Sequence, residues 1–156
     1  MQNPPPVPVQ TGSEVNAKTA LGLDANLGAA LGYPVGIIAI IIFFMEKENR
    51  FARFHAVQSV LLFVLVFVLF IVLALVSVLL PILLALIGSA AGGAVGLVVS
   101  IISTLVWVIS LLVWLILPLL SLGVFILAAV KAYGGNYFKL PVIGKMAEKF
   151  SGGAAS

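Results

Sequence analysis

The charged residues of this chain are placed so unevenly that they decide its class. No Asp, Glu, Lys or Arg occurs between Arg53 and Lys131, and His55 is the one histidine in that gap. A water-soluble fold cannot leave every surface position of such a stretch uncharged. A bilayer requires it, because one charge at mid-depth costs about 2.5–3.5 kcal/mol. Only 8% of the 156 residues are charged, against roughly 25% in soluble domains. The sequence therefore predicts an all-α, polytopic transmembrane protein.

Three apolar runs are long enough to cross a bilayer as helices, which takes about 20 residues. They cover residues 27–45, 57–87 and 94–130. As helices, the second and third would be roughly 46 and 56 Å long, against about 30 Å of hydrocarbon. Pro81 predicts a kink or a break in the second run, and Pro118 leaves the third as one over-long helix or two spans. Tilt, a piece lying along the membrane surface, or a protruding apolar hairpin covered by a partner would each accommodate the surplus.

The positive-inside rule favours three spans over four. With three, the loop at 46–53 and the C-terminal tail share one side. That side then holds seven basic residues against Lys18 alone: Lys47, Arg50, Arg53, Lys131, Lys139, Lys145 and Lys149. With four spans, the basic residues divide three against five. We therefore expect a multi-pass protein of the cell membrane, with the N-terminus outside and the C-terminus in the cytoplasm.

The two ends of the chain predict different environments. Residues 1–23 are rich in proline and polar residues and predict a flexible tail, followed by a transmembrane domain over 24–131. Residues 132–156 predict a cytoplasmic interfacial tail with a short amphipathic helix, whose apolar face holds Val142, Ile143, Met146, Ala147 and Phe150. Its expected interface anchors are Tyr133, Tyr137, Phe138, Lys139, Lys145 and Lys149.

Two patterns of small residues predict helix packing. Gly28, Gly32 and Gly36 repeat every four residues, a spacing that lets helix backbones approach closely in lipid. A heptad-like spacing places a second set on one helix face: Ser100, Ser103, Trp107, Ser110, Trp114 and Ser121. This face is interpreted as an internal packing seam, and the alternative is a surface for a partner helix, a lipid or an aromatic cofactor.

The groups needed for catalysis are scarce. The chain has no Cys, and its acids, Glu14, Asp24, Glu46, Glu48 and Glu148, all lie outside the predicted spans. No carboxylate within the membrane can therefore orient His55, and one histidine makes no metal site. We expect a protein that is not an enzyme, holds no metal and binds no nucleic acid. His55 is interpreted as a hydrogen-bonded anchor. No cofactor is predicted, while bound lipid or pigment stays open, with His55, Trp107 and Trp114 as the candidates.

Two segments, residues 53–59 and residues 131–141, resemble a family of small, uncharacterised bacterial membrane proteins of the Tic-like (chloroplast import component-like) type. The first is Arg53-Phe54-His55-Ala56-Val57-Gln58-Ser59, which is similar to that family's RFHAxQS sequence. The second runs from Lys131-Ala132-Tyr133 to Lys139-Leu140-Pro141 and is similar to its ending. The resemblance implies a membrane protein of three or four helices with a distant link to protein translocation, and it implies no catalytic residues.

The function that these patterns favour is a non-enzymatic membrane scaffold or accessory subunit. Its expected partners are membrane lipids and other membrane subunits or further copies of itself. The alternative, which the resemblance suggests, is a component of a protein-translocation or permeation pathway.

Overall fold

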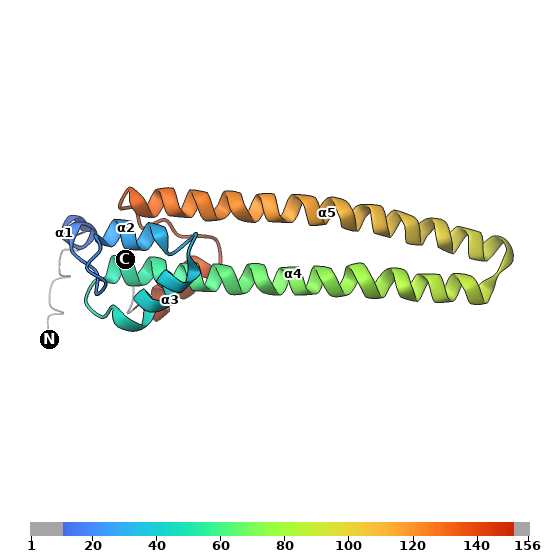
Figure 1. The fold of residues 1–156 in the computed structure, drawn as a ribbon, viewed down its shortest axis with the longest axis horizontal. Coiled ribbons are helices and arrows are strands. Elements are labelled where there is room, and N and C mark those ends of the chain that lie inside the picture. Colours follow the sequence, from blue (N-terminus) through green and yellow to red (C-terminus); the bar gives the residue numbers. More distant parts are fainter. Residues whose placement is uncertain (1–10, 152–156) are drawn as a thin grey trace, which may run out of the picture. The chain divides into compact units, whose positions relative to one another are not determined.

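The structure, a computed structural model, describes residues 11–151 and is helical over most of that range (Figure 1). The six helices are α1 (Thr11–Asn16), α2 (Ala25–Leu31), α3 (Gly36–Met45), α4 (Arg50–Ala91), α5 (Gly93–Tyr133) and α6 (Ile143–Phe150). The predicted all-α fold is confirmed. The predicted flexible tail over 1–23 is wrong for residues 11–16, which form α1, and residues 1–10 lie outside the described part of the chain.

The chain divides into two compact units. Within the described residues, unit 1 comprises 11–63 and 124–151, and unit 2 comprises 64–123. Helices α4 and α5 each contribute to both units. All the charged residues among those described belong to unit 1, because unit 2 lies wholly within the charge-free stretch of the sequence.

In unit 1, the first apolar run does not form one helix. It is divided at Gly32–Val35 into α2 and α3, which pack against each other. Gly28 lies opposite Ile42 and Gly32 lies opposite Ala39, so the two helices run in opposite directions. Seven and ten residues give helices of about 10 and 15 Å, too short to cross about 30 Å of hydrocarbon. The span predicted over 27–45 is therefore replaced by a helical hairpin that ends near the level where it begins.

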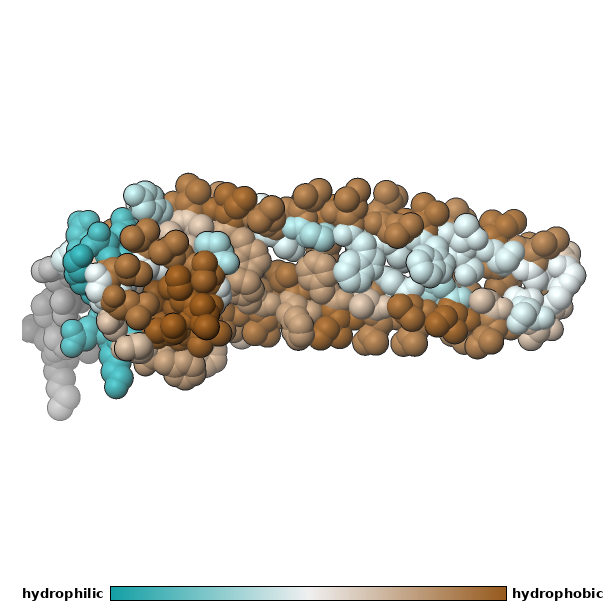
Figure 2. Space-filling model, in the orientation of Figure 1, coloured by the Kyte–Doolittle hydropathy of each residue, from teal (hydrophilic) through white to brown (hydrophobic). Residues whose placement is uncertain are grey.

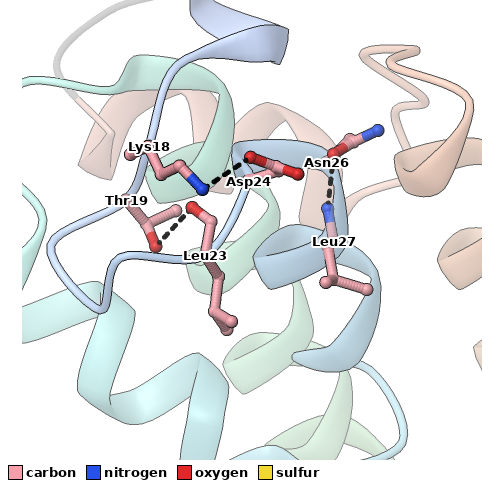
Figure 3. Close-up of polar contacts among 6 residues, drawn as sticks. All are labelled: Lys18, Thr19, Leu23, Asp24, Asn26 and Leu27. Carbon is pink, nitrogen blue, oxygen red and sulfur yellow. Dashed lines mark hydrogen bonds and ion pairs between the residues drawn. The ribbon is translucent and has the colours of Figure 1, made fainter.

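The loop before α2 is held by local contacts (Figure 3). Thr19 Oγ1 donates a hydrogen bond to the carbonyl of Leu23 at 3.1 Å. Asp24 occupies the N-cap position of α2, but its side chain pairs with Lys18 Nζ at 3.3 Å instead of capping the helix (Figure 3). Lys18, expected to stand alone on the far side of the membrane, thus belongs to the same unit as the other basic residues.

Unit 2 is formed by the apolar parts of α4 and α5. Both helices continue through their prolines, so the chain is not broken at Pro81 or at Pro118. At 42 and 41 residues, the helices are about 63 and 62 Å long. They join at Gly92 and Gly93, whose positive φ angles of 61° and 52° suit glycine. Figure 2 shows hydrophobic surface along both helices, interrupted on this face by a paler stripe.

Helices α4 and α5 are both long and apolar enough to cross a membrane, whereas α3, the other apolar helix among those described, has ten residues. Most large apolar side chains of unit 2 are exposed, from Val64 to Leu122. In water this surface would be costly at about 25 cal/mol per Å², and in hydrocarbon it costs nothing. The exposed surface and the length of these helices fit a membrane environment.

Candidate functional site

The residues of the RFHAxQS segment meet in a buried polar network in unit 1, which we call the polar clamp. It consists of Tyr33, His55, Gln58 and Ser59, all of them buried. The last three lie near the start of α4, and their spacing of three and four residues places them on one face of the helix. Tyr33 comes from the turn between α2 and α3, directly after Gly32.

Hydrogen-bond chemistry fixes the direction of each proton in the clamp. His55 Nε2 lies 2.9 Å from the carbonyl oxygen of Asn136, which can only accept, so Nε2 carries the hydrogen. Nδ1 of the neutral ring then accepts from Tyr33 Oη at 3.0 Å. Tyr33 Oη in turn accepts from Gln58 Nε2 at 2.8 Å. Each polar atom of the His55 and Tyr33 side chains therefore has a hydrogen-bond partner.

Gln58 and Ser59 extend the clamp to two more segments. Gln58 Nε2 also donates to the carbonyl of Phe138 at 3.0 Å, and Gln58 Oε1 accepts from the amide of Leu140 at 3.1 Å. Ser59 Oγ donates to the carbonyl of Gly32 at 2.7 Å. The clamp thus joins the α2–α3 turn, the start of α4 and the segment after α5. Its chemistry holds segments together and exposes no reactive group.

Arg53 and Phe54, which open the segment, have separate environments. Phe54 is buried in a cluster with Val57 and Ala147, against which Phe43, Leu61 and Tyr137 pack. Arg53 is partly buried, and its Nε has no hydrogen-bond partner among the described residues. Phe54 therefore holds α6 against α4.

A second polar cluster, absent from the sequence analysis, surrounds the α3–α4 loop. The Glu46 carboxylate accepts from three amides, those of Ala20, Glu48 and Asn49, at 2.8–3.2 Å. Asn49 caps α4 by accepting from the amide of Ala52 at 3.0 Å. A cavity of about 690 Å³ opens beside this cluster. An Asn directly before an apolar helix is a typical N-cap, so the role of Asn49 could have been predicted from the sequence. The contact between Glu46 and the amide of Ala20, 26 residues apart, could not.

The same cluster binds the N-terminal helix to the C-terminal segment. Asn49 Nδ2 donates to the carbonyl of Glu14 at 2.7 Å, and Tyr137 Oη donates to Glu14 Oε2 at 2.8 Å. Burial raises the pKa of Tyr137, and the hydrogen bond to Glu14 and its charge raise it further, against the opposing charge of Arg50. Tyr137 therefore stays a hydrogen-bond donor at neutral pH. Residues 14, 49 and 137 therefore meet in one cluster.

The three repeated glycines pack within unit 1. Methyl groups added to Gly28 and Gly32 would lie 3.3 Å from atoms of Ile42 and Ala39 on α3. A methyl on Gly36 would meet the ring of Phe63 on α4 at 2.9 Å. The repeat therefore serves two different contacts, since the α2–α3 turn separates Gly36 from the first two glycines.

In unit 2, the Ser/Trp face is only partly an internal seam. Ser103, Ser110 and Ser121 are partly buried, whereas Ser100, Trp107 and Trp114 are exposed. Trp114 reaches α4, where its indole nitrogen donates to Ser77 Oγ at 3.2 Å and its ring lies 5.6 Å from that of Phe70. A groove of about 440 Å³ lies nearer the turn, lined by Leu84, Ala85, Gly88, Ser89, Gly96, Ser100, Ser103 and Thr104.

Trp107 differs from Trp114 in having no polar contact. It is 52% exposed, and its indole nitrogen has no hydrogen-bond partner among the described residues. The three cofactor candidates are therefore divided between units: His55 belongs to unit 1, and both tryptophans belong to unit 2.

The predicted interface anchors also serve different contacts. Tyr133 is exposed, and its carbonyl accepts from Asn26 Nδ2 at 3.2 Å. Phe138 is partly buried, and Lys139 forms an ion pair with Glu148. Lys145 and Lys149 are exposed on α6, with no ion pair within the described range 11–151.

Comparison with known proteins finds relatives that share one family name. The chain is 36% identical over 138 residues to a UPF0132 membrane protein of Methanocaldococcus jannaschii, which covers 86% of this chain and 94% of the relative. It is 31% identical over 135 residues to a UPF0132 membrane protein of Archaeoglobus fulgidus, covering 84% and 99%. No family model and no solved structure matches. The Tic-like bacterial resemblance is therefore wrong, because the relatives are archaeal UPF0132 membrane proteins.

Proposed function

Because this chain belongs to the UPF0132 family of membrane proteins, we propose that it is a non-enzymatic membrane scaffold or accessory subunit. In this role, unit 2 packs against a helix of another membrane subunit or of a second copy. A role in protein translocation or permeation has no support left, because the Tic-like resemblance that suggested it is wrong.

The observation that carries this proposal is Trp107. An indole N–H in hydrocarbon seeks an acceptor, and tryptophan otherwise prefers the membrane interface. Trp107, the fifteenth of the 41 residues of α5, is exposed without such an acceptor, on the same face as the small side chains of Ser100 and Ser103. Small residues admit a neighbouring helix closely, and a hydroxyl or carbonyl on that helix would accept from the indole.

A photo-crosslinking amino acid at residue 107 tests the proposal in the native membrane. We expect it to form a protein adduct several-fold more often than the same group at Ile109. Ile109 is the matched control, because it is equally exposed but lies about 200° around the helix from Trp107. Equal protein adducts at both positions, or only lipid adducts at both, would contradict the proposal.

We further propose that the chain crosses the membrane twice, with both ends of its described part in the cytoplasm. Contacts of Glu14 with Asn49 and Tyr137 support this topology over one with the N-terminus outside. All eight Lys and Arg residues then lie on one side, a stronger bias than seven against one.

Single cysteines in this cysteine-free chain test the topology. We expect a membrane-impermeant maleimide added outside intact cells to label Ala91→Cys but neither Lys18→Cys nor Lys149→Cys. The two lysine positions should react after the membrane is permeabilised, which controls for buried thiols. Labelling of Lys18→Cys from outside, with Lys149→Cys still protected, would restore the three-span topology.

A further inference from the structure

Helix α6 packs on α4 where the charged start of α4 gives way to its apolar part. Ala147 of α6 belongs to the cluster with Phe54 and Val57, and a methyl on Gly144 would lie 3.1 Å from Gln58 Oε1. Arg53, one residue before this contact, is the last charged residue of α4. In a helix that crosses a bilayer, this transition lies near the headgroups. Helix α6 therefore lies at the depth where an interfacial helix would be placed.

Only part of the apolar face of α6 is covered by the protein. Ile143, Gly144 and Ala147 are buried against unit 1. A second apolar stripe, Val142, Met146 and Phe150, is 76%, 42% and 58% exposed. Met146 and Phe150 are spaced by four and so lie along one line of α6, and Val142 stands directly before the helix, at its N-cap position with a φ of 66°. The amphipathic helix thus has an inner apolar face that packs and an outer one that does not.

The charges beside the outer stripe are of one sign. Lys145 and Lys149 each precede a stripe residue, Met146 or Phe150, and therefore border the stripe. The one acid of α6, Glu148, pairs with Lys139. That pairing leaves Lys145 and Lys149 as the helix's uncompensated charges among the described residues. An apolar stripe edged by two lysines matches an anionic lipid surface, with acyl chains below and phosphates above.

We propose that α6 is an interfacial anchor that selects anionic phospholipid. Val142, Met146 and Phe150 enter the outer acyl region, and Lys145 and Lys149 bind the headgroup phosphates. This proposal does not depend on the scaffold role, because that role concerns unit 2. It also does not depend on which side of the membrane unit 1 occupies.

Nitroxide labels on single cysteines test the depth of the stripe in the full chain. The chain is reconstituted in phosphatidylcholine bilayers containing phosphatidylglycerol. Labels at Met146→Cys and Phe150→Cys should be relaxed more by oxygen than by a water-soluble nickel chelate, and a label at Lys145→Cys should show the reverse. Equal exposure of all three labels to the chelate would overturn the proposal. Immobilised labels at 146 and 150 that neither reagent reaches would also overturn it, because they would indicate a protein partner.

The two lysines are tested by the preference for spin-labelled phosphatidylglycerol over phosphatidylcholine. The double variant Lys145→Gln/Lys149→Gln should lower this preference by about fivefold per lysine. Lys18→Gln is the matched control, because it removes an exposed lysine of the same unit that already pairs with Asp24. A double variant whose lipid preference equals that of Lys18→Gln would overturn the selective role of the lysines.

Discussion

Replacing Gln58 with leucine is expected to lower the free energy of unfolding of unit 1 by about 3–5 kcal/mol. Leucine fills a similar volume but removes three hydrogen bonds, so Tyr33 Oη, the carbonyl of Phe138 and the amide of Leu140 lose a partner. A buried polar group left unsatisfied costs about 1–3 kcal/mol. Denaturant unfolding in detergent micelles gives the loss, and hydrogen exchange locates it at residues 136–144.

Ser59→Ala provides the matched control for Gln58→Leu. It removes one bond of the same clamp, to the carbonyl of Gly32, and should cost about 1–2 kcal/mol. Its effect should appear as faster exchange at the α2–α3 turn, with residues 136–144 still protected. If Gln58→Leu unfolds like the unmodified chain, the clamp does not hold the segment after α5.

Gly144→Ala is expected to destabilise the attachment of α6 by about 2–3 kcal/mol. The added methyl would lie 2.9 Å from Lys139 Cβ, 3.0 Å from Lys139 Cα and 3.1 Å from Gln58 Oε1. Because one of these atoms belongs to the backbone, a side-chain rotation cannot relieve the contact. Limited trypsin digestion measures the effect: the side chains of Lys145 and Lys149 are already exposed, but cleavage beside them requires the backbone of α6 to detach and unfold.

Gly123→Ala is the control for this steric argument. Gly123 lies within α5, and a methyl there would have nothing within 4 Å. Alanine favours a helix over glycine by up to about 1 kcal/mol, so this variant should be neutral or slightly stabilised. Equal digestion of the Gly144→Ala variant and the unmodified chain would show that α6 has room to shift.

The membrane class of the protein and its two long helices could be predicted from the sequence. The positions of the charged residues and the lengths of the apolar runs are both visible there. A stretch without charge from 54 to 130 leaves few alternatives to a membrane. The hairpin of α2 and α3 did not follow, since an apolar run of 19 residues satisfies the length of a span whether or not it turns. Ser59 fixes that turn through the carbonyl of Gly32, and so distant a contact leaves no periodicity to read.

The polar clamp, too, could be predicted only in part from the sequence. His55, Gln58 and Ser59 could be singled out by residue type and spacing, but three of their partners are the backbone groups of residues 136, 138 and 140. Every residue has such groups, so the side-chain sequence cannot identify them. The Ser/Trp face was predicted as one seam, but α4 contacts only part of it: Trp114 bonds to Ser77 of α4, whereas Ser100 and Trp107 stay exposed.

The turn between α4 and α5 bears on how the protein enters a bilayer. Residues 88–96 contain only Gly, Ser, Ala and Val, and the two glycines at the turn reverse the chain without a polar loop. Insertion of the two helices as a pair would therefore carry no charged group through the hydrocarbon. The energetic barrier to translocating that turn would come from a few backbone groups alone, so biogenesis would need no large domain to be moved across.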